Sequence, residues 1–144
     1  MKRVYGYVRR SREKENLSLQ AQEKSIRAFC ESQGWELLDV FSDNATGENT
    51  FRADYQRMLN SVKESNTRHI DLILVAKLDR VSRRLKDILI LIEDQLTPMG
   101  IGLKSVTEPF DSSTAEGRLM ISMLGSFAEF ERMRISERMQ DGKH

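Results

Sequence analysis

Two serines in this chain lie among arginines, and the chain has only two histidines that could activate a hydroxyl. The first serine ends the run Tyr7-Val8-Arg9-Arg10-Ser11, which closes an apolar segment near the N-terminus. The second lies in residues 77–84, KLDRVSRR, which close another apolar segment. Guanidinium groups bind phosphate oxygens in a forked geometry and keep their charge. A hydroxyl among such charges suits attack on a phosphate better than attack on an acyl carbon.

Two common alternatives for a reactive serine do not fit the sequence. A Ser-His-Asp triad needs an imidazole, but His69 precedes a predicted strand, at the edge opposite the arginines, and His144 is the last residue. The glycine pattern of a P-loop, followed by Lys-Ser or Lys-Thr, is absent. Arginines aimed at one phosphodiester would stabilise its transition state, typically by about 3 kcal/mol for each donor. Serine attack on DNA would give a phosphoserine ester and a free hydroxyl, so the strand could be rejoined without ATP.

Metal-assisted chemistry is a competing hypothesis. Asp43, Asp79, Glu108 and Asp111 could be neighbours and bind Mg²⁺, as in a carboxylate nuclease or a phosphotransfer domain. The abundance of arginine beside them weakens this hypothesis, because carboxylates paired with arginine are poor metal ligands. We therefore expect no metal and no cofactor. A non-catalytic dimerisation module is a third hypothesis.

Composition predicts one domain over residues 1–144 with only local concentrations of positive charge. The net charge is +1, so the phosphate-binding arginines are clustered rather than spread.

We expect a cytoplasmic protein, because Met1-Lys2-Arg3 is not followed by the apolar segment of a signal peptide and no apolar run approaches the ~20 residues of a membrane span. The single cysteine, Cys30, is predicted to be a small core residue. The three arginine clusters are Arg9, Arg10 and Arg12; Arg80, Arg83 and Arg84; and Arg132, Arg134 and Arg138.

Alternating strands and helices predict an α/β sandwich of three layers with a mostly parallel central sheet. Strands are predicted at residues 4–8, 35–41, 70–76 and 101–106, and helices at 18–33, 52–63, 84–96 and from about 116 onward. Pro98 and Gly100 are predicted to end the third helix, and loops are predicted at 10–16 and 42–47. In such folds chemistry lies beyond the carboxyl ends of the strands. Arg9, Asp43, Arg80 and Glu108 all follow strand ends, so we expect them at one edge. Gln22, an amide on the apolar stripe of the first helix, either bonds within that helix or points toward this edge.

The last predicted helix is apolar nearly all round from Leu119 to Phe130 and charged beyond it. A surface helix of a small domain needs only one apolar stripe. The surplus predicts a second subunit against this helix, whose charged end projects toward solvent or DNA. A helix wholly buried within one domain is the alternative.

These motifs resemble the catalytic domain of serine recombinases, the family of resolvases, invertases and large serine integrases. Tyr7-Val8-Arg9-Arg10-Ser11 is similar to the nucleophile motif Tyr-x-Arg-Val-Ser, and residues 18–22, SLQAQ, to Ser-Leu-x-x-Gln. Residues 78–83, LDRVSR, match Leu-Asp-Arg-x-x-Arg, which is highly specific. Further matches are residues 41–43, FSD; 51–52, FR; and the long-helix signature EFER-x-RI-x-ER at 129–138. Because the segments occur in the family's order, the resemblance covers essentially the whole chain.

The resemblance implies a metal-free recombinase in which Ser11 attacks DNA. Arg9, Arg80 and Arg83 would hold the scissile phosphate, Arg52 and Arg132 would contribute, and Gln22, Asp43 and Asp79 would position them. Arg10, Arg12, Arg134 and Arg138 are predicted to contact DNA. Family members bind double-stranded DNA as dimers that form tetramers at synapsis, here through the helix at about 116–140, and they cut, rotate and rejoin the strands.

Two departures from the family pattern stand out. Arg10 replaces the usual valine beside the nucleophile, so that either the loop packs differently or Arg10 faces DNA. The chain also shows no helix-turn-helix and no zinc-ribbon cysteines, so we expect the DNA-binding domain to be absent and binding by these residues alone to be weak and unspecific. The segment FRADYQRML at 51–59 leans toward the large integrase group, while a resolvase, an invertase and a transposase stay open.

Overall fold

The computed structural model describes residues 1–10, 18–44, 52–64, 69–82 and 84–141, and for 127–132 and 135–141 it describes the backbone only. At its centre is a sheet of four strands, β1 (Arg3–Arg10), β2 (Glu36–Asn44), β3 (Leu72–Val75) and β4 (Gly102–Ser105). The strands lie in the order β2-β1-β3-β4, and every neighbouring pair is parallel. The predicted α/β class is confirmed, and the described sheet is parallel throughout.

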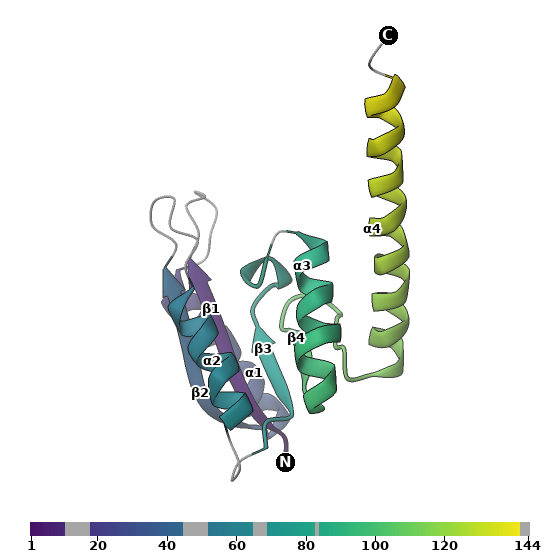
Figure 1. The fold of residues 1–144 in the computed structure, drawn as a ribbon. Helices are drawn as coiled ribbons and strands as arrows, with labels where there is room; N and C mark the ends of the chain where they lie inside the picture. The colour runs from purple at the N-terminus through teal and green to yellow at the C-terminus, as the bar shows by residue number, and fades with distance from the viewer. Residues whose placement is uncertain (11–17, 45–51, 65–68, 83, 142–144) are drawn as a thin grey trace.

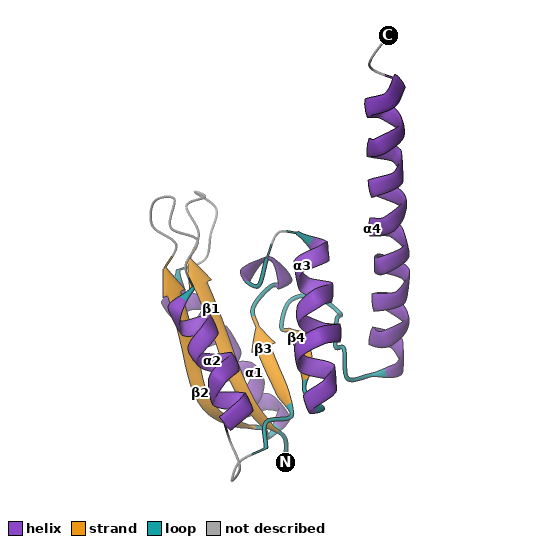
Figure 2. Cartoon of the chain, viewed as in Figure 1, coloured by secondary structure: helices purple, strands orange, loops and turns teal. Residues whose placement is uncertain are grey.

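Helices cover both faces of this sheet and make the three predicted layers (Figures 1 and 2). α1 (Leu19–Gln33) packs on one face, where Val4 and Val8 of β1 meet Ile26 and Cys30. α2 (Ala53–Glu64) and the helical segments after β3 cover the other face, which receives Tyr5 and Tyr7. Because side chains alternate along a strand, β1 contributes to both cores. The chain passes from β1 to β2 and then back beyond β1 to β3, so right-handed crossovers place α1 and α2 on opposite faces.

The first helix begins and ends as its sequence predicts. Ser18 is the N-cap, and its hydroxyl accepts a hydrogen bond from the N–H of Ala21 at 3.0 Å. Gly34 ends the helix in the left-handed conformation, with φ of 70°. Gly6 lets α1 approach β1 closely, since a Cβ at this position would lie 3.2 Å from Cγ2 of Ile26. Cys30 is a buried core residue, as predicted.

The first two strands extend further than predicted. Their polar ends were expected to form loops, but β1 continues through Arg10 and β2 through Asn44, with Arg9 opposite Asp43; residues 45–47 lie outside the described part. Paired strands keep their ladder of backbone hydrogen bonds whatever their side chains, which propensity does not anticipate. β3 ends at Val75, which is level with Tyr7. Arg9 and Arg10 therefore project beyond the end of β3.

The helical region after β3 is less regular than the predicted continuous helix. α3 (Leu85–Ile90) is followed by a π-helical segment, η2 (Leu91–Leu96), and a 3₁₀ turn, η3 (Thr97–Met99). The helical run ends at Leu96, as predicted, and Pro98 lies in the 3₁₀ turn that follows, which Gly100 ends with φ of 74°. The remaining described elements begin within two residues of prediction, and β3 and β4 are each shorter than predicted by no more than two residues at either end.

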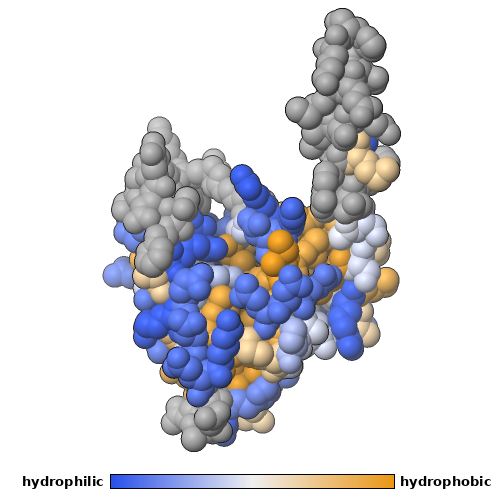
Figure 3. Space-filling view, in the orientation of Figure 1, coloured by the Kyte–Doolittle hydropathy of each residue, from blue (hydrophilic) through white to orange (hydrophobic). Residues whose placement is uncertain are grey.

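The last helix, α4 (Ala115–Asp141), stands beside the body and extends past it (Figure 1). Its first turns pack on the core through Ile121, which is 6% exposed. On its other side Leu119, Met123 and Met133 are 63%, 64% and 59% exposed. Apolar surface gathers over α3 and the base of α4 (Figure 3). A helix wholly buried within one domain, the alternative considered above, is therefore wrong.

Across the part of the chain that the structure describes, we find no helical stretch with the length and apolar character of a bilayer crossing.

Candidate active site

The arginines meet where β1 projects beyond β3. The connection after β1 leads to β2 on one side of the sheet and the connection after β3 leads to β4 on the other, and ligands of parallel sheets bind at such a switch between strands. Arg80 belongs to a 3₁₀ turn, η1 (Leu78–Arg80), that directly follows β3, and it is only 5% exposed. Its Nη1 donates a hydrogen bond to the carbonyl of Arg9 at 3.4 Å. The predicted meeting of Arg9 and Arg80 at the carboxyl edge is thus present.

Gln22 holds the main chain of Arg9 in place. Its Nε2 donates to the Arg9 carbonyl at 2.9 Å, and its Oε1 accepts the Arg9 N–H at 3.1 Å. The side chain is fully buried and occupies both main-chain groups of Arg9, as a neighbouring strand would. Of the two interpretations of this amide, bonding toward the site is confirmed.

Arg52 reaches the same edge from the start of α2. Its Nη2 donates to the carbonyl of Arg80 at 2.9 Å, while its Nε is buried and has no hydrogen-bond partner in the described part of the chain. The guanidinium carbon lies 4.5 Å from the ring centre of Tyr55 and 5.5 Å from that of Tyr7. Three arginines from three different elements are therefore joined through main-chain carbonyls.

Asp43 connects β2 to this group through tyrosine rather than arginine. Its Oδ2 accepts the Tyr7 hydroxyl at 2.8 Å and the Tyr55 N–H at 3.0 Å, and its Oδ1 accepts the Asp54 N–H at 3.0 Å. Burial raises the pKa of Tyr55 to about 12, and burial with the Asp43 hydrogen bond raises the pKa of Tyr7 despite the opposing charge of Arg52. Both phenols stay neutral at physiological pH. Sequence analysis missed both tyrosines as site residues, although Tyr7 lies within the nucleophile motif.

The other carboxylates serve different segments. Asp79 lies 3.4 Å from Nε of Arg80, as a positioning residue would, and Glu108 accepts the N–H of Leu78 at 2.6 Å and so fixes the start of η1. Asp111 is not at this edge: the chain turns back after Glu108, and Asp111 pairs with Lys104 inside β4, which corrects its predicted place. Within the described ranges no three Asp, Glu, His or Cys residues form a group that could hold a metal ion.

The second serine among arginines has a structural task. The Ser82 hydroxyl donates to Asp87 at 3.1 Å and accepts the N–H of Arg84 at 3.0 Å, so it holds the turn that leads into α3.

Several predicted residues lie outside the described part. They are Ser11, Arg12 and Arg83, together with the side chains of Arg132 and Arg138. Ser11 is joined directly to Arg10, the last residue of β1. Arg10 and Arg134 are exposed, and Arg10 continues β1 opposite Asn44. The usual valine position therefore carries a surface charge in this chain.

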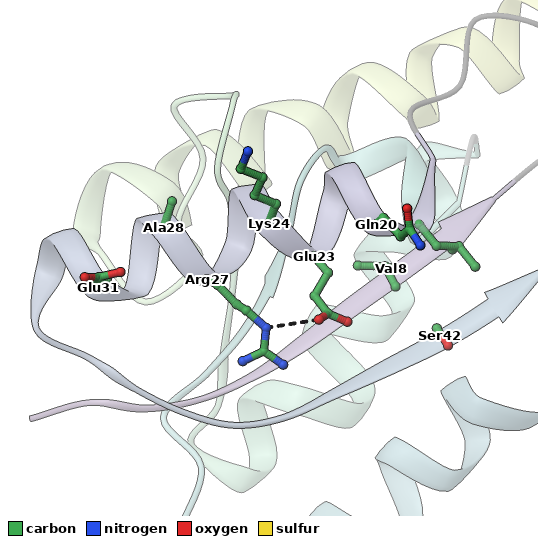
Figure 4. A pocket seen from close by; sticks show the side chains of 9 residues that line it. Val8, Gln20, Glu23, Lys24, Arg27, Ala28, Glu31 and Ser42 are labelled. Atoms are coloured by element: carbon green, nitrogen blue, oxygen red, sulfur yellow. Dashed lines mark hydrogen bonds and ion pairs between the residues drawn. The ribbon is translucent and has the colours of Figure 1, made fainter.

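A groove of about 490 Å³ lies between α1 and the β1–β2 side of the sheet (Figure 4). Its lining carries Glu23, Lys24, Arg27 and Glu31, and Glu23 pairs with Arg27 at 3.0 Å. Two positive and two negative side chains leave no net charge for a phosphate. The arginine edge is the better candidate for the active site.

Comparison with known proteins identifies the family of the chain. The family described as "Resolvase, N terminal domain" matches residues 4–144. The DNA-invertase of Enterobacteria phage P7 is 36% identical over 139 residues, 96% of this chain and 67% of that protein. Serine recombinase gin of Escherichia phage Mu is 33% identical over 96% of this chain and 65% of its own length. The chain thus spans about two thirds of these relatives.

A solved structure gives the same result. The N-terminal catalytic domain of TP901-1 integrase superposes with a TM-score of 0.80 and 33% identity, covering 92% of this chain and 98% of that one. The arginine edge, the parallel sheet and these matches together show that the chain belongs to the resolvase N-terminal domain family, the catalytic domains of serine site-specific recombinases.

Proposed function

We propose that this domain performs site-specific DNA recombination, and that Ser11 cleaves DNA through a covalent phosphoserine intermediate. One observation carries the proposal: Arg9, Arg52 and Arg80 are bonded to one another at the sheet edge that adjoins Ser11. This arrangement fixes positive charge at the end of the strand that Ser11 follows in the sequence. It suits a phosphodiester, whose transition state gains negative charge on its oxygens.

In the proposed reaction the Ser11 oxygen forms a bond to phosphorus while the bond to the leaving deoxyribose oxygen breaks. The serine loses its proton, and the leaving oxygen gains one to become a free hydroxyl. Arg9, Arg80 and Arg83 hold the phosphate, with Arg52 and Arg132 as contributors. Gln22, Asp79 and Asp43 position them, and the hydrogen bonds of Gln22 to Arg9 support that role. Reversal of the same step rejoins DNA without a metal or a nucleotide.

The proposed partners are double-stranded DNA and further copies of this chain. Leu119 and Met123 of α4 are more than half exposed, which supports a dimer through this helix and a tetramer at synapsis. Arg10 and Arg134, which are exposed, are proposed to contact DNA phosphates together with Arg12 and Arg138. The competing metal-dependent nuclease is less well supported, because Asp43 and Glu108 already accept main-chain hydrogen bonds.

Covalent trapping tests this function. The full-length recombinase is mixed with a nicked cognate site in EDTA, and the DNA–protein adduct is mapped on denaturing gels and by peptide analysis. We expect an adduct on Ser11 that Ser11→Ala abolishes. Ser82→Ala is the matched control, because this serine also lies among arginines but its hydroxyl bonds Asp87 and the Arg84 N–H in the turn before α3, and the adduct should persist in this variant. Cleavage that needs Mg²⁺ and leaves no adduct would instead favour the carboxylate mechanism.

A further inference from the structure

We propose that Tyr55, together with Tyr7, is a positioning residue that holds Arg52 in the orientation for phosphate binding. The inference rests on the proposed function, since it deepens the role of one arginine at the same site. Neither ring was predicted to take part in catalysis, and by its burial alone Tyr55 would be classed as an ordinary core residue of α2.

The two rings form a corner around the guanidinium. They meet edge to face, with centres 5.4 Å apart and planes inclined by 71°. Arg52 lies over both, and the shorter distance, 4.5 Å, is to Tyr55. Tyr7 is fully buried and Tyr55 is 9% exposed, so neither ring can turn away into solvent.

Asp43 holds this corner from behind. It accepts one hydrogen bond from the Tyr7 hydroxyl and one from the main-chain N–H of Tyr55. A single carboxylate at the end of β2 thereby fixes one ring directly and the backbone of the other. Because Arg52 immediately precedes α2, the same hydrogen bonds also fix where its side chain begins.

Aromatic faces are suited to this task for an electrostatic reason. A ring attracts a cation through its quadrupole but brings no counter-charge. None of the ion pairs that join described residues involves Arg52. A cation held over a ring gains this attraction without a carboxylate partner, so guanidinium N–H groups can still donate to other oxygen acceptors. The Nη2 of Arg52 donates to Arg80, and the buried Nε has no hydrogen-bond partner among the described residues.

Two substitutions separate the ring from the hydroxyl. Tyr55→Phe keeps the aromatic face, so we expect adduct formation on nicked DNA within twofold of the parent. Tyr55→Leu removes the face, and we expect the rate to fall about tenfold. Tyr5→Leu is the matched control, because Tyr5 is equally buried and pairs edge to face with Phe41 but does not contact Arg52. It should lower stability in urea without lowering the rate when the protein is folded.

A double-mutant cycle tests whether Tyr55 acts through Arg52. In an Arg52→Ala background, Tyr55→Leu should slow cleavage no further. Equal losses in both backgrounds, or equal losses for Tyr55→Phe and Tyr55→Leu, would overturn the inference. If Arg52→Ala alone leaves the rate unchanged, the role of Arg52 in the proposed function fails instead, and the inference fails with it.

A measurement on the unaltered protein covers the case in which a variant does not fold. Ring currents from a face 4.5 Å away should shift the Arg52 Nε–H resonance upfield of the exposed arginines in an NMR spectrum. A resonance at the position of the exposed arginines would contradict the proposed contact.

Discussion

The arginine edge and α4 lie on the same chain but are stabilised in opposite ways. At the edge, Arg9, Arg52 and Arg80 are held by bonds to Gln22 and to one another's carbonyls, and Arg80 is 5% exposed. On α4, Leu119 and Met123 are more than 60% exposed, and Ile121 alone among these three is buried. One region has its geometry fixed within the chain, whereas the other leaves apolar surface uncovered.

The difference indicates how work is divided in this domain. A phosphate site needs donors fixed before the substrate arrives, because reorganisation during reaction weakens electrostatic stabilisation. A helix with exposed apolar side chains gains by being covered, since burial yields about 25 cal/mol for each Å². In the proposed function, one subunit positions the groups for chemistry, and the proposed dimer covers the exposed side of α4. Four variants, each with its own control, test this contrast.

Arg80→Ala should have the largest effect. Removal of a buried donor at the site is expected to slow adduct formation by about 10² to 10³-fold. The measurement is a single-turnover rate on nicked DNA with the full-length recombinase. Arg84→Ala is the control, because Arg84 belongs to the same sequence cluster but is exposed. Similar losses for both would mean that a diffuse positive patch, rather than a fixed site, binds the phosphate.

Gln22→Ala should have the next largest effect, this time on folding. It leaves the N–H and carbonyl of Arg9 without their Gln22 partner, so we expect the free energy of unfolding to fall by about 2 to 3 kcal/mol. Urea unfolding of the 144-residue chain measures this change. Gln20→Ala, on the exposed side of the same helix, should change stability by less than about 0.5 kcal/mol. A loss no greater than that of Gln20→Ala would show that the edge is not fixed through Gln22.

Asp54→Asn tests whether the hydrogen bonds that stabilise the arginine edge extend to Ser42 of β2. Asp54 accepts the N–H of Ser42 at 3.0 Å, and this hydrogen bond is the main reason that its pKa lies below the ordinary value of 3.8. The stabilisation is therefore complete above pH 3.8 and is lost as the pH falls through the lower value of the folded state.

At pH 7 we expect Asp54→Asn to lower the free energy of unfolding, measured in urea, by about 1 kcal/mol. The difference from the parent should shrink in acid. Asp94→Asn, an exposed carboxylate on η2, is the control and should show neither effect. A cost that stays constant from pH 7 down to pH 2 would contradict the assigned cause.

Leu119→Ser with Met123→Ser should have the smallest effect on the stability of one subunit, below about 0.5 kcal/mol, because both side chains are exposed. Self-association measured by sedimentation should nevertheless weaken. Ile121 lies on the same turn of the helix but faces inward, so Ile121→Ala should lower the free energy of unfolding by about 2 to 4 kcal/mol. If the double substitution destabilises the isolated subunit as strongly as Ile121→Ala, the outer face of α4 is covered within the chain.

Local patterns in the sequence determined much of this domain. Strand and helix periodicity predicted the parallel sheet, and the polar residues after each strand predicted the edge where Arg9 and Arg80 meet. Gln22 stood out because an amide on an apolar stripe must find a partner. The surplus of apolar residues on the last helix predicted its exposed face. These features depend on residues close together in the chain, so they can be read without a structure.

Only the tertiary structure decided which distant groups make contact. β1 and β2 extend through Arg10 and Asn44 because the two strands stay paired there, although the polar side chains of this region predicted loops. Asp111 left the edge because the chain turns back along β4. The contact of Tyr55 with Arg52 and the hydrogen bonds of Asp43 depend on how α2 docks against β1 and β2. Contacts between segments far apart in sequence are set by packing and register, and no periodicity within one segment encodes them.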